Sequence, residues 1–440
     1  MNTPAQATVQ ADPPLECRQV YRKIARRLIP FLFILYLIAY VDRVNVGFAK
    51  LQMSAELGFS DLVYGFGSGI FFIGYFLFEV PSNLILHRVG AKVWIARILL
   101  TWGVISAAMA LVNSAASFYT LRFLLGVGEA GFFPGIILYL TYWFPSGLRA
   151  KSTTSFMTAI AVAGIVAGPV SGYVMDAMDG WLDLRGWQWL FLLEGLPAIG
   201  LGVVTYLFLD DGPESADWLS REEKQSLLTQ LADDKASRGI GDPHESLRKT
   251  FISPRVWLLA LIYFCLALGL YGVSFWLPQI IHDLNQGGLT LTGLLSAIPY
   301  AVAVLVMVAV ARSSDATQER RWHIATSSIM GGLGLVMLVW VRGHPVLSIA
   351  ALGLATSGIL AALSTFWSLP TAFLSGRTAA GGIALINSIG NLGGYFGPFL
   401  LGWVKQTSGN LDAGLYVLAS GLILAGMLVA RIGLLSDTQQ

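Results

Sequence analysis

The sequence is poor in charge and in the residues that build catalytic or metal centres. Only 12% of its 440 residues are charged, about half the share of a typical soluble protein, which is too little to cover a water-exposed surface. The net charge of +2 excludes a strongly basic nucleic-acid-binding domain. Cys17 and Cys265 have no neighbour at disulfide or metal-ligand spacing. We therefore expect no metal, no cofactor and no nucleic-acid partner.

Apolar sequence is abundant instead, at 55% of the residues. A helix needs about 20 apolar residues to cross a bilayer, where every backbone polar group must be paired internally. The first apolar run is longer than the core of a signal peptide, so we expect an uncleaved first span. The pattern predicts an all-α membrane protein with twelve transmembrane helices, over residues 28–49, 64–86, 93–113, 117–141, 153–176, 188–209, 255–281, 290–311, 322–341, 346–372, 379–405 and 411–432.

One long polar stretch, residues 210–254, holds 16 charged residues and separates six expected spans from the other six. Within it, Ser220 and Glu223 have the spacing of a capping box, which predicts a short helix through about Lys235. This linker either latches the two halves together or is simply solvated. The expected domains are an N-terminal tail (1–27), a six-helix bundle (28–209), the linker (210–254), a second six-helix bundle (255–433) and a C-terminal tail (434–440).

The basic residues are distributed unevenly among the expected loops. Of 28 Lys and Arg, 22 lie in the tails, the even-numbered loops or their margins, and two lie inside spans. The other four, in odd-numbered loops, are Lys50, Arg185, Arg342 and Lys405. Since cytoplasmic loops carry the excess of basic residues, we expect both termini and the linker to lie in the cytoplasm, with the spans in the inner membrane.

A repeated pattern indicates a duplicated six-helix unit. Gly164-x-x-x-Gly168-Pro169 in the fifth span matches Gly393-x-x-x-Gly397-Pro398 in the eleventh, and the two prolines are 229 residues apart. The loop after span two matches the loop after span eight at nearly the same offset, with His87 and Asp315 228 residues apart. Each glycine motif alone is typical of close helix packing. The shared offset predicts two pseudo-symmetric bundles.

Ionisable groups inside the expected spans are the main functional candidates, because each costs at least about 2.5–3.5 kcal/mol to insert. Arg122 and Glu129 are two helical turns apart on one face, about 10 Å along the axis, and Asp42 and Arg43 lie near the depth of Arg122. An anion bound by the arginines would release the acids to take up protons, which is a minimal coupling mechanism. The alternative is structural pairing, with Arg43 bound simply to Asp42.

Two further acids have other expected roles. Glu79 precedes Pro81 in span two and is expected to organise the following loop at Arg88, or a gate. Glu194 is expected to have a structural partner. The second half offers neutral groups for a substrate pocket, although polar groups also join helices. The candidates are Tyr271, Trp276, Gln279, Ser364, Trp367, Asn387 and Asn391, with Tyr75 on the first-half wall.

The segments 40–49, 74–83 and 122–135, with the tryptophan-rich start of span six, carry a resemblance over the full length of the chain. The chain resembles the major facilitator superfamily, and within it the anion:cation symporter branch of tartrate, phthalate, hydroxyphenylacetate and galactonate permeases. The resemblance implies alternating access by two bundles around a midplane site. It also implies proton coupling by Asp42 and Glu129, an anion near Arg43 and Arg122, and pocket roles for Tyr75 and Asn391.

One position departs from the family pattern. His87 stands where the loop after span two usually carries an acid, so the charge relay that locks this side is expected to be weaker or to rest on Glu79 and Asp315. A pH-sensitive latch at His87 and a merely tolerated substitution are both open.

These observations favour proton-coupled uptake of a small organic anion, such as a sugar acid, a tartrate-like acid or an aromatic carboxylate, by a monomeric carrier. An exporter or exchanger on the same fold is the alternative. An enzyme is disfavoured, because the five histidines lie in loops or at span edges, away from the intramembrane acids. A sensor without transport is disfavoured as well.

Overall fold

The structure is a computed structural model that describes residues 15–145, 148, 158–236, 252–285, 287–373 and 376–437. Within these residues it is helical, without strands. The first half contains α1 (Leu15–Val44), α2 (Val46–Leu57), α3 (Asp61–Val89), α4 (Ala91–Ala108), α5 (Ala115–Glu129), α6 (Phe132–Trp143), α8 (Ala159–Ala177) and α9 (Gly186–Phe208). α10 (Arg221–Ala236) lies in the linker. The second half contains α12 (Pro254–Asn285), α13 (Leu289–Thr317), α14 (Arg321–Trp340), α15 (Pro345–Phe366), α16 (Ser368–Phe373), α17 (Gly376–Asn391), α18 (Gly393–Ser408) and α19 (Asp412–Asp437).

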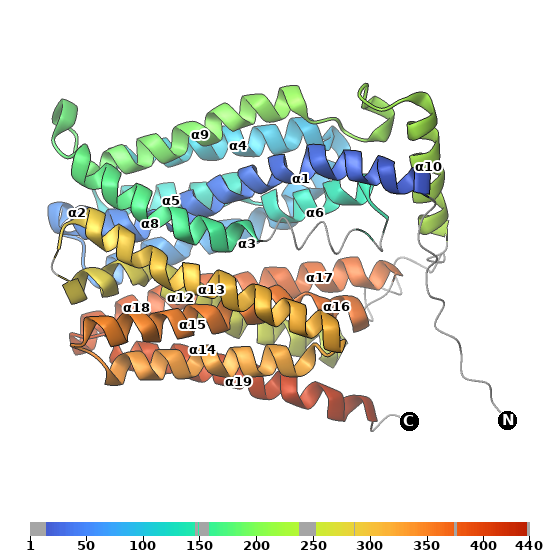
Figure 1. Ribbon diagram of the computed structural model, residues 1–440. Coiled ribbons are helices and arrows are strands. Elements are labelled where there is room, and N and C mark those ends of the chain that lie inside the picture. The colour runs from blue at the N-terminus through green and yellow to red at the C-terminus, as the bar shows by residue number, and fades with distance from the viewer. Residues whose placement is uncertain are drawn as a thin grey trace.

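The helices form two layers, one from each half of the chain, lying side by side (Figure 1). Among the described residues, eleven helical segments are long and apolar enough to cross a membrane. The one remaining span, the eleventh in chain order, is α17 followed by α18, which the structure divides at Leu392. The predicted fold of twelve spans in two bundles is confirmed. We call the end of the bundle near α10 the terminal end, and the opposite end, near α2, the remote end (Figure 1).

Several spans that we expected to be continuous are interrupted. The first span breaks at Asn45, between α1 and α2, and the fourth breaks at Ala130 and Gly131, between α5 and α6. Gly131 has φ of +84°, and a Cβ there would lie 2.4 Å from the Ser82 hydroxyl oxygen. Only glycine fits both constraints easily. These breaks matter because they end α1 and α5 beside the predicted charged residues.

Two glycine-lined contacts close the halves against each other towards the remote end. α8 meets α13 where a Cβ on Gly293 would lie 2.2 Å from the Gly168 carbonyl oxygen. α3 meets α18 where a Cβ on Gly65 would lie 2.7 Å from the Pro398 carbonyl oxygen. The small residues therefore let backbones approach closely, and the Gly168 motif serves packing between the halves.

Replacing Gly293 with valine is expected to open the remote end, because the side chain cannot fit against the Gly168 carbonyl. We expect a cysteine at Ser296, which is 2% exposed, to react several times faster with a membrane-impermeant maleimide in this variant. Gly353→Val is the matched control, since the nearest atom to a Cβ there lies 4.0 Å away. Unchanged labelling of Ser296→Cys in the Gly293→Val protein contradicts the expected closure.

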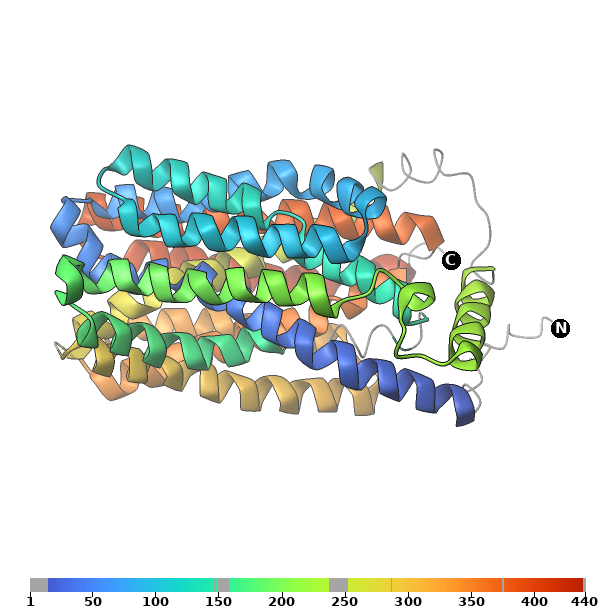
Figure 2. The ribbon, with the colours of Figure 1, turned by 90° about the horizontal axis from the view of Figure 1, so that it is seen from above.

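The short helix predicted in the linker is confirmed as α10. The Ser220 amide donates to Glu223 Oε2 at 2.8 Å, and the Glu223 amide donates to the Ser220 hydroxyl at 3.2 Å, which is the capping box. Figure 2 shows α10 across the terminal end, beside the start of α1. Lys23 donates to Glu223 at 2.7 Å and Tyr21 donates to Gln230 at 2.7 Å. The linker helix is thus tied to the first half.

This attachment is expected to weaken in acid. The hydrogen bond from Lys23 lowers the pKa of Glu223. The stabilisation that the Lys23–Glu223 pair gives to this attachment is therefore complete above the unfolded pKa of about 4.3. It is lost as the pH falls through the lower pKa of the folded state. Hydrogen exchange of the α10 amides, corrected for intrinsic rates, should show less protection at about pH 3.5 than at pH 6. Glu223→Gln should remove most of that difference. Equal protection of the unsubstituted protein at both pH values contradicts the prediction.

Candidate functional site

A buried ion pair joins Arg43 and Glu129 at the point where two helices end. Arg43 lies in the last turn of α1, and Glu129 is the last residue of α5. Their side chains are 7% and 1% exposed, and Arg43 Nη2 contacts Glu129 Oε1 directly. Arg43 Nη1 also donates to the Tyr271 hydroxyl at 3.1 Å. Because Tyr271 belongs to α12, the pair links the first half to the second.

Arg122 is fully buried on α5 and has no carboxylate partner among the described residues. Its Nε and Nη2 donate to the backbone carbonyls of Gly67 and Ser68, at 3.4 and 3.2 Å. Its Nη1 is buried without a hydrogen-bond partner. A buried charge is normally paired, so this guanidinium has an unmet requirement for an anion.

Asp42 is the complementary case, a buried acid without an ion pair in the described part of the chain. It is 1% exposed. The Trp102 indole donates to Oδ2 at 2.5 Å, Asn45 donates to Oδ1 at 3.3 Å, and the Ser106 hydroxyl contacts Oδ1. The site therefore holds one neutralised pair and two charges without a direct counter-ion.

The predicted charged residues lie near one another, since Arg43 and Arg122 lie over the same Phe71 ring, but the alternative pairing of Arg43 with Asp42 is wrong. Arg43 pairs with Glu129 across two helices instead of with Asp42. Arg122 and Glu129 share α5, yet Arg122 binds backbone carbonyls. Counting residues along a span gives the depth of a side chain in the membrane. It does not give the rotation of the helix about its axis, so it could not identify these contacts.

Aromatic side chains border the charged group on both halves. Arg43 lies 5.3 Å from the centre of the Phe71 ring and 5.6 Å from the Tyr75 ring, within the range of cation–π attraction. Tyr271 packs on Phe72 with ring centroids 4.4 Å apart. The structure thus brings two predicted pocket residues, Tyr75 and Tyr271, to the arginine.

Trp276 and Gln279 lie with a different group, towards the remote end. Lys50 Nζ donates to Gln279 Oε1 at 2.7 Å and lies 4.7 Å from the Trp276 ring. It also pairs with Asp61 at 2.9 Å, and Lys405 approaches the same carboxylate at 3.7 Å. Lys50 was expected in a loop, whereas it is 5% exposed in α2. These contacts join the first half to α12 and α18 at the remote end.

The Glu79 side chain on α3 links the two halves at a level closer to the terminal end. Asn387 donates to its Oε1 at 2.5 Å, and Ser388 donates to Oε2 at 3.1 Å. This carboxylate is therefore placed to hold α3 against α17, as a gating residue would be. Asn391, 8% exposed, is one helical turn beyond Asn387 on α17.

The remaining predicted site residues lie outside the charged group. The Ser364 hydroxyl donates to the Ala361 carbonyl of its own helix at 2.9 Å. Trp367 packs on Tyr263 with ring centroids 4.9 Å apart. Glu194 accepts from the Ser171 hydroxyl at 2.9 Å, the structural partner that we expected.

The two predicted gating residues in loops, Arg88 and Asp315, make no contact with each other in the described residues. Asp315 pairs with Arg320 at 2.5 Å, within the second half. Arg88 is exposed, and His87 Nδ1 lies 3.3 Å from the Tyr142 hydroxyl, within the first half. Of the three predicted gating residues, only Glu79 connects the halves within the part of the chain that the structure describes.

The fold and these buried charges define a membrane transporter, and comparison with known proteins agrees. Residues 32–398 match the Major Facilitator Superfamily; the chain belongs to this family and is a multi-pass membrane transporter of small molecules, not an enzyme. It is 48% identical to a protein of Agrobacterium vitis named for tartrate transport, over 95% of both chains. It is 45% identical to a quinolone resistance transporter of Acinetobacter baumannii, over 94% of this chain and 96% of that protein.

A solved structure shares the fold at low sequence identity. It is a bacterial homologue of the human lysosomal transporter Spinster, in an inward-facing and occupied conformation. The TM-score is 0.73 at 16% identity, covering 93% of this chain and 96% of the other. This likeness supports the twelve-helix architecture.

Proposed function

We propose that the protein is a proton-coupled symporter that takes up a small organic anion. The observation that carries the proposal is Arg122, a buried guanidinium with an unpartnered Nη1 and no carboxylate partner among the described residues. A carboxylate of the substrate would supply the missing counter-ion through a charge-assisted hydrogen bond. The sequence identity of 48% with a relative named for tartrate transport supports a carboxylate as the substrate class.

The pair of Arg43 and Glu129 supplies the coupling step. A substrate carboxylate that reached Arg43 would compete with Glu129 for the guanidinium. A displaced carboxylate in so buried a position is expensive to keep charged, so Glu129 would take up a proton. Asp42, already held by neutral donors, would be the second proton site. Anion and proton would then travel together.

The two closures of the bundle would provide alternating access. The remote end is closed by the glycine contacts and by Lys50, Asp61 and Lys405, while Glu79 links the halves nearer the terminal end. We place the remote end at the outside of the inner membrane and the termini in the cytoplasm, because the basic residues gather at the terminal end. Rocking of the halves would open these closures in turn.

The proposal is tested by uptake into vesicles containing the purified protein. With the outside more acidic, tartrate, several sugar acids and several aromatic carboxylates are each offered in radioactive form, beside the uncharged amide of each acid. We expect accumulation of at least one acid and of no amide. Amide uptake as fast as that of the acid contradicts the role of the arginines.

The similarity to the quinolone resistance transporter favours export as a second function. Quinolone accumulation in cells that express the protein separates the two. Export predicts less drug in expressing cells than in cells with an empty vector, and uptake of carboxylates alone predicts equal amounts.

A further inference from the structure

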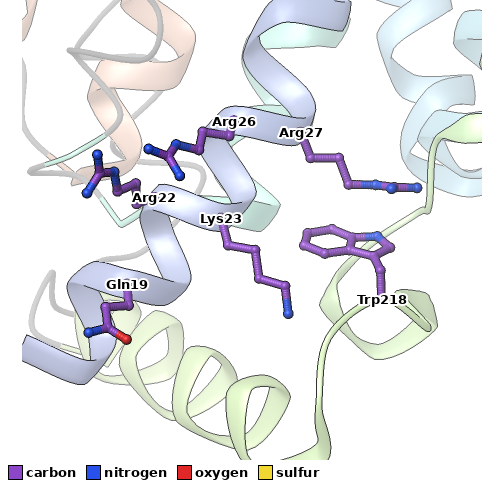
Figure 3. Close-up of a pocket in the computed structure, with 6 residues that line it drawn as sticks. All are labelled: Gln19, Arg22, Lys23, Arg26, Arg27 and Trp218. Carbon is purple, nitrogen blue, oxygen red and sulfur yellow. The ribbon is translucent and has the colours of Figure 1, made fainter.

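A basic pocket lies at the terminal end, where the polar start of α1 meets the linker. It has a volume of about 630 Å³ and is lined by Gln19, Arg22, Lys23, Arg26, Arg27 and Trp218. Figure 3 shows Arg27 lying over Trp218, with the side chains of Arg22 and Arg26 extending together on another side of α1. The transport mechanism uses none of these residues.

The four cations of the pocket have three different kinds of surroundings. Lys23 is neutralised by Glu223 at 2.7 Å. Arg27 lies over aromatic rings, 4.4 Å from the centre of Phe208 and 5.0 Å from that of Trp218. Arg22 and Arg26 are exposed and have no acidic partner in the described part of the chain. Arg22, Arg26 and Arg27 therefore all keep an unneutralised charge among the described residues, and Arg22 and Arg26 are the two that are exposed to a ligand.

The spacing of Gln19, Arg22 and Arg26 suits an anion with several oxygens. Intervals of three and four residues place them on one face of α1. Two like charges one helical turn apart repel each other, so the site favours an anion that both guanidinium groups can share. A phosphate can accept hydrogen bonds from two arginines at once.

The position of the pocket relative to the membrane indicates the source of the phosphate. The apolar part of α1 begins at Leu28, directly after Arg27, so the pocket lies at the level of lipid headgroups. Phe208 ends α9, whose last turns expose Val203, Tyr206 and Leu207. This apolar surface lies on the Arg27 side of the pocket and marks the same membrane level. Basic pockets beside spans bind anionic headgroups.

The pocket is held in shape by contacts that involve no ligand. The Trp218 indole donates to Asp210 at 2.8 Å, and its ring stacks on Trp143 with centroids 5.7 Å apart. The hydrogen bond from Tyr21 to Gln230 fixes α1 against α10. A preformed site loses little conformational freedom on binding.

We propose that this basic pocket binds the phosphate of an anionic phospholipid, with Gln19, Arg22 and Arg26 as the headgroup ligands. The phosphate lies on the exposed face of α1 that carries these three residues, just before the apolar part of the helix begins at Leu28. The site is separate from the transport site and is independent of the substrate carried.

The test uses the full-length protein, purified in a neutral detergent and stripped of lipid. Phosphatidylglycerol, phosphatidylcholine or inorganic phosphate is added, and binding is followed by native mass spectrometry and by the thermal unfolding midpoint. We expect phosphatidylglycerol to bind and to raise the midpoint, and the other two to do neither. Arg22→Gln combined with Arg26→Gln should weaken this binding about 30-fold, from about fivefold for each arginine near an anionic headgroup.

Arg312→Gln combined with Arg431→Gln is the matched control, because both residues are exposed near the terminal end of the second half and lie outside the pocket. The control should bind the lipid as the unsubstituted protein does. Unchanged lipid binding in the Arg22 and Arg26 variant overturns the proposal, as does an equal loss in the control. Equal stabilisation by inorganic phosphate overturns the assignment to lipid.

Discussion

Replacing Arg122 with glutamine is expected to weaken binding of the transported anion by about 10- to 150-fold. This range follows from the roughly 1.5–3 kcal/mol that a hydrogen bond to a charged group contributes. Glutamine can still donate to the Gly67 or Ser68 carbonyl, which Arg122 now contacts. It cannot offer the positive charge or the free Nη1. The substitution should therefore lower the affinity for the anion more than it lowers the stability of the fold.

The measurement is equilibrium binding of the substrate to the purified variant, together with its thermal unfolding midpoint. Arg122→Lys should give an intermediate affinity, because lysine keeps the charge without the planar fork of donors. Arg97→Gln is the control, since Arg97 is half-buried on α4 over Trp94 and belongs to no charged group of the site. Unchanged affinity in Arg122→Gln contradicts the assignment of Arg122 to the anion.

Replacing Glu129 with glutamine is expected to abolish accumulation driven by a pH gradient while leaving exchange of labelled for unlabelled substrate. Glutamine can accept a hydrogen bond from Arg43, as Glu129 now does, but it cannot gain or lose a proton. The carrier would still bind the anion and alternate between its two states. It would lose the step that makes a proton obligatory.

Glu194→Gln is the matched control for this prediction. Glu194 is also a buried acid of the first half, and it is held by Ser171 at 2.9 Å. It should keep gradient-driven uptake because it contacts neither arginine among the described residues. Full gradient-driven uptake in Glu129→Gln, or an equal loss in Glu194→Gln, contradicts the specific role of Glu129.

The architecture could be predicted from the sequence because the bilayer imposes a simple length rule. Apolar runs of about 20 residues must be helices, and the capping box of Ser220 and Glu223 depends only on local spacing. The repeated glycine motifs also had a structural basis. Gly168 faces Gly293, and Gly397 faces the backbone at Leu268, so both motifs allow close helix contacts.

The helix breaks and the exact ion pairs could not be predicted in the same way. The break at Gly131 depends on its positive φ and on the nearby Ser82, a contact between distant segments. Lys50 was assigned to a loop because it follows an apolar run, yet α2 buries it against Asp61, Gln279 and Trp276. The sequence Val46–Leu57 could have indicated that the helix continues past Lys50, because it remains largely apolar on both sides of this residue.

Trp102 and Ser106 are the partners of Asp42 that sequence reasoning missed. They are four residues apart on α4 and so lie on one face of a helix. A tryptophan and a serine at this spacing, in an otherwise apolar span, are a weak signal of a polar contact. Only the rotation of α4 against α1 shows that Asp42 is what they bind.

The most direct test of the central claim is the internal pH of vesicles during substrate uptake. Vesicles containing the protein, with equal pH on both sides, receive the transported anion outside, and an internal dye reports the pH. The account predicts that the interior becomes more acidic as the anion accumulates, and that Glu129→Gln abolishes this change. Anion uptake by the unsubstituted protein with no change in internal pH would contradict it.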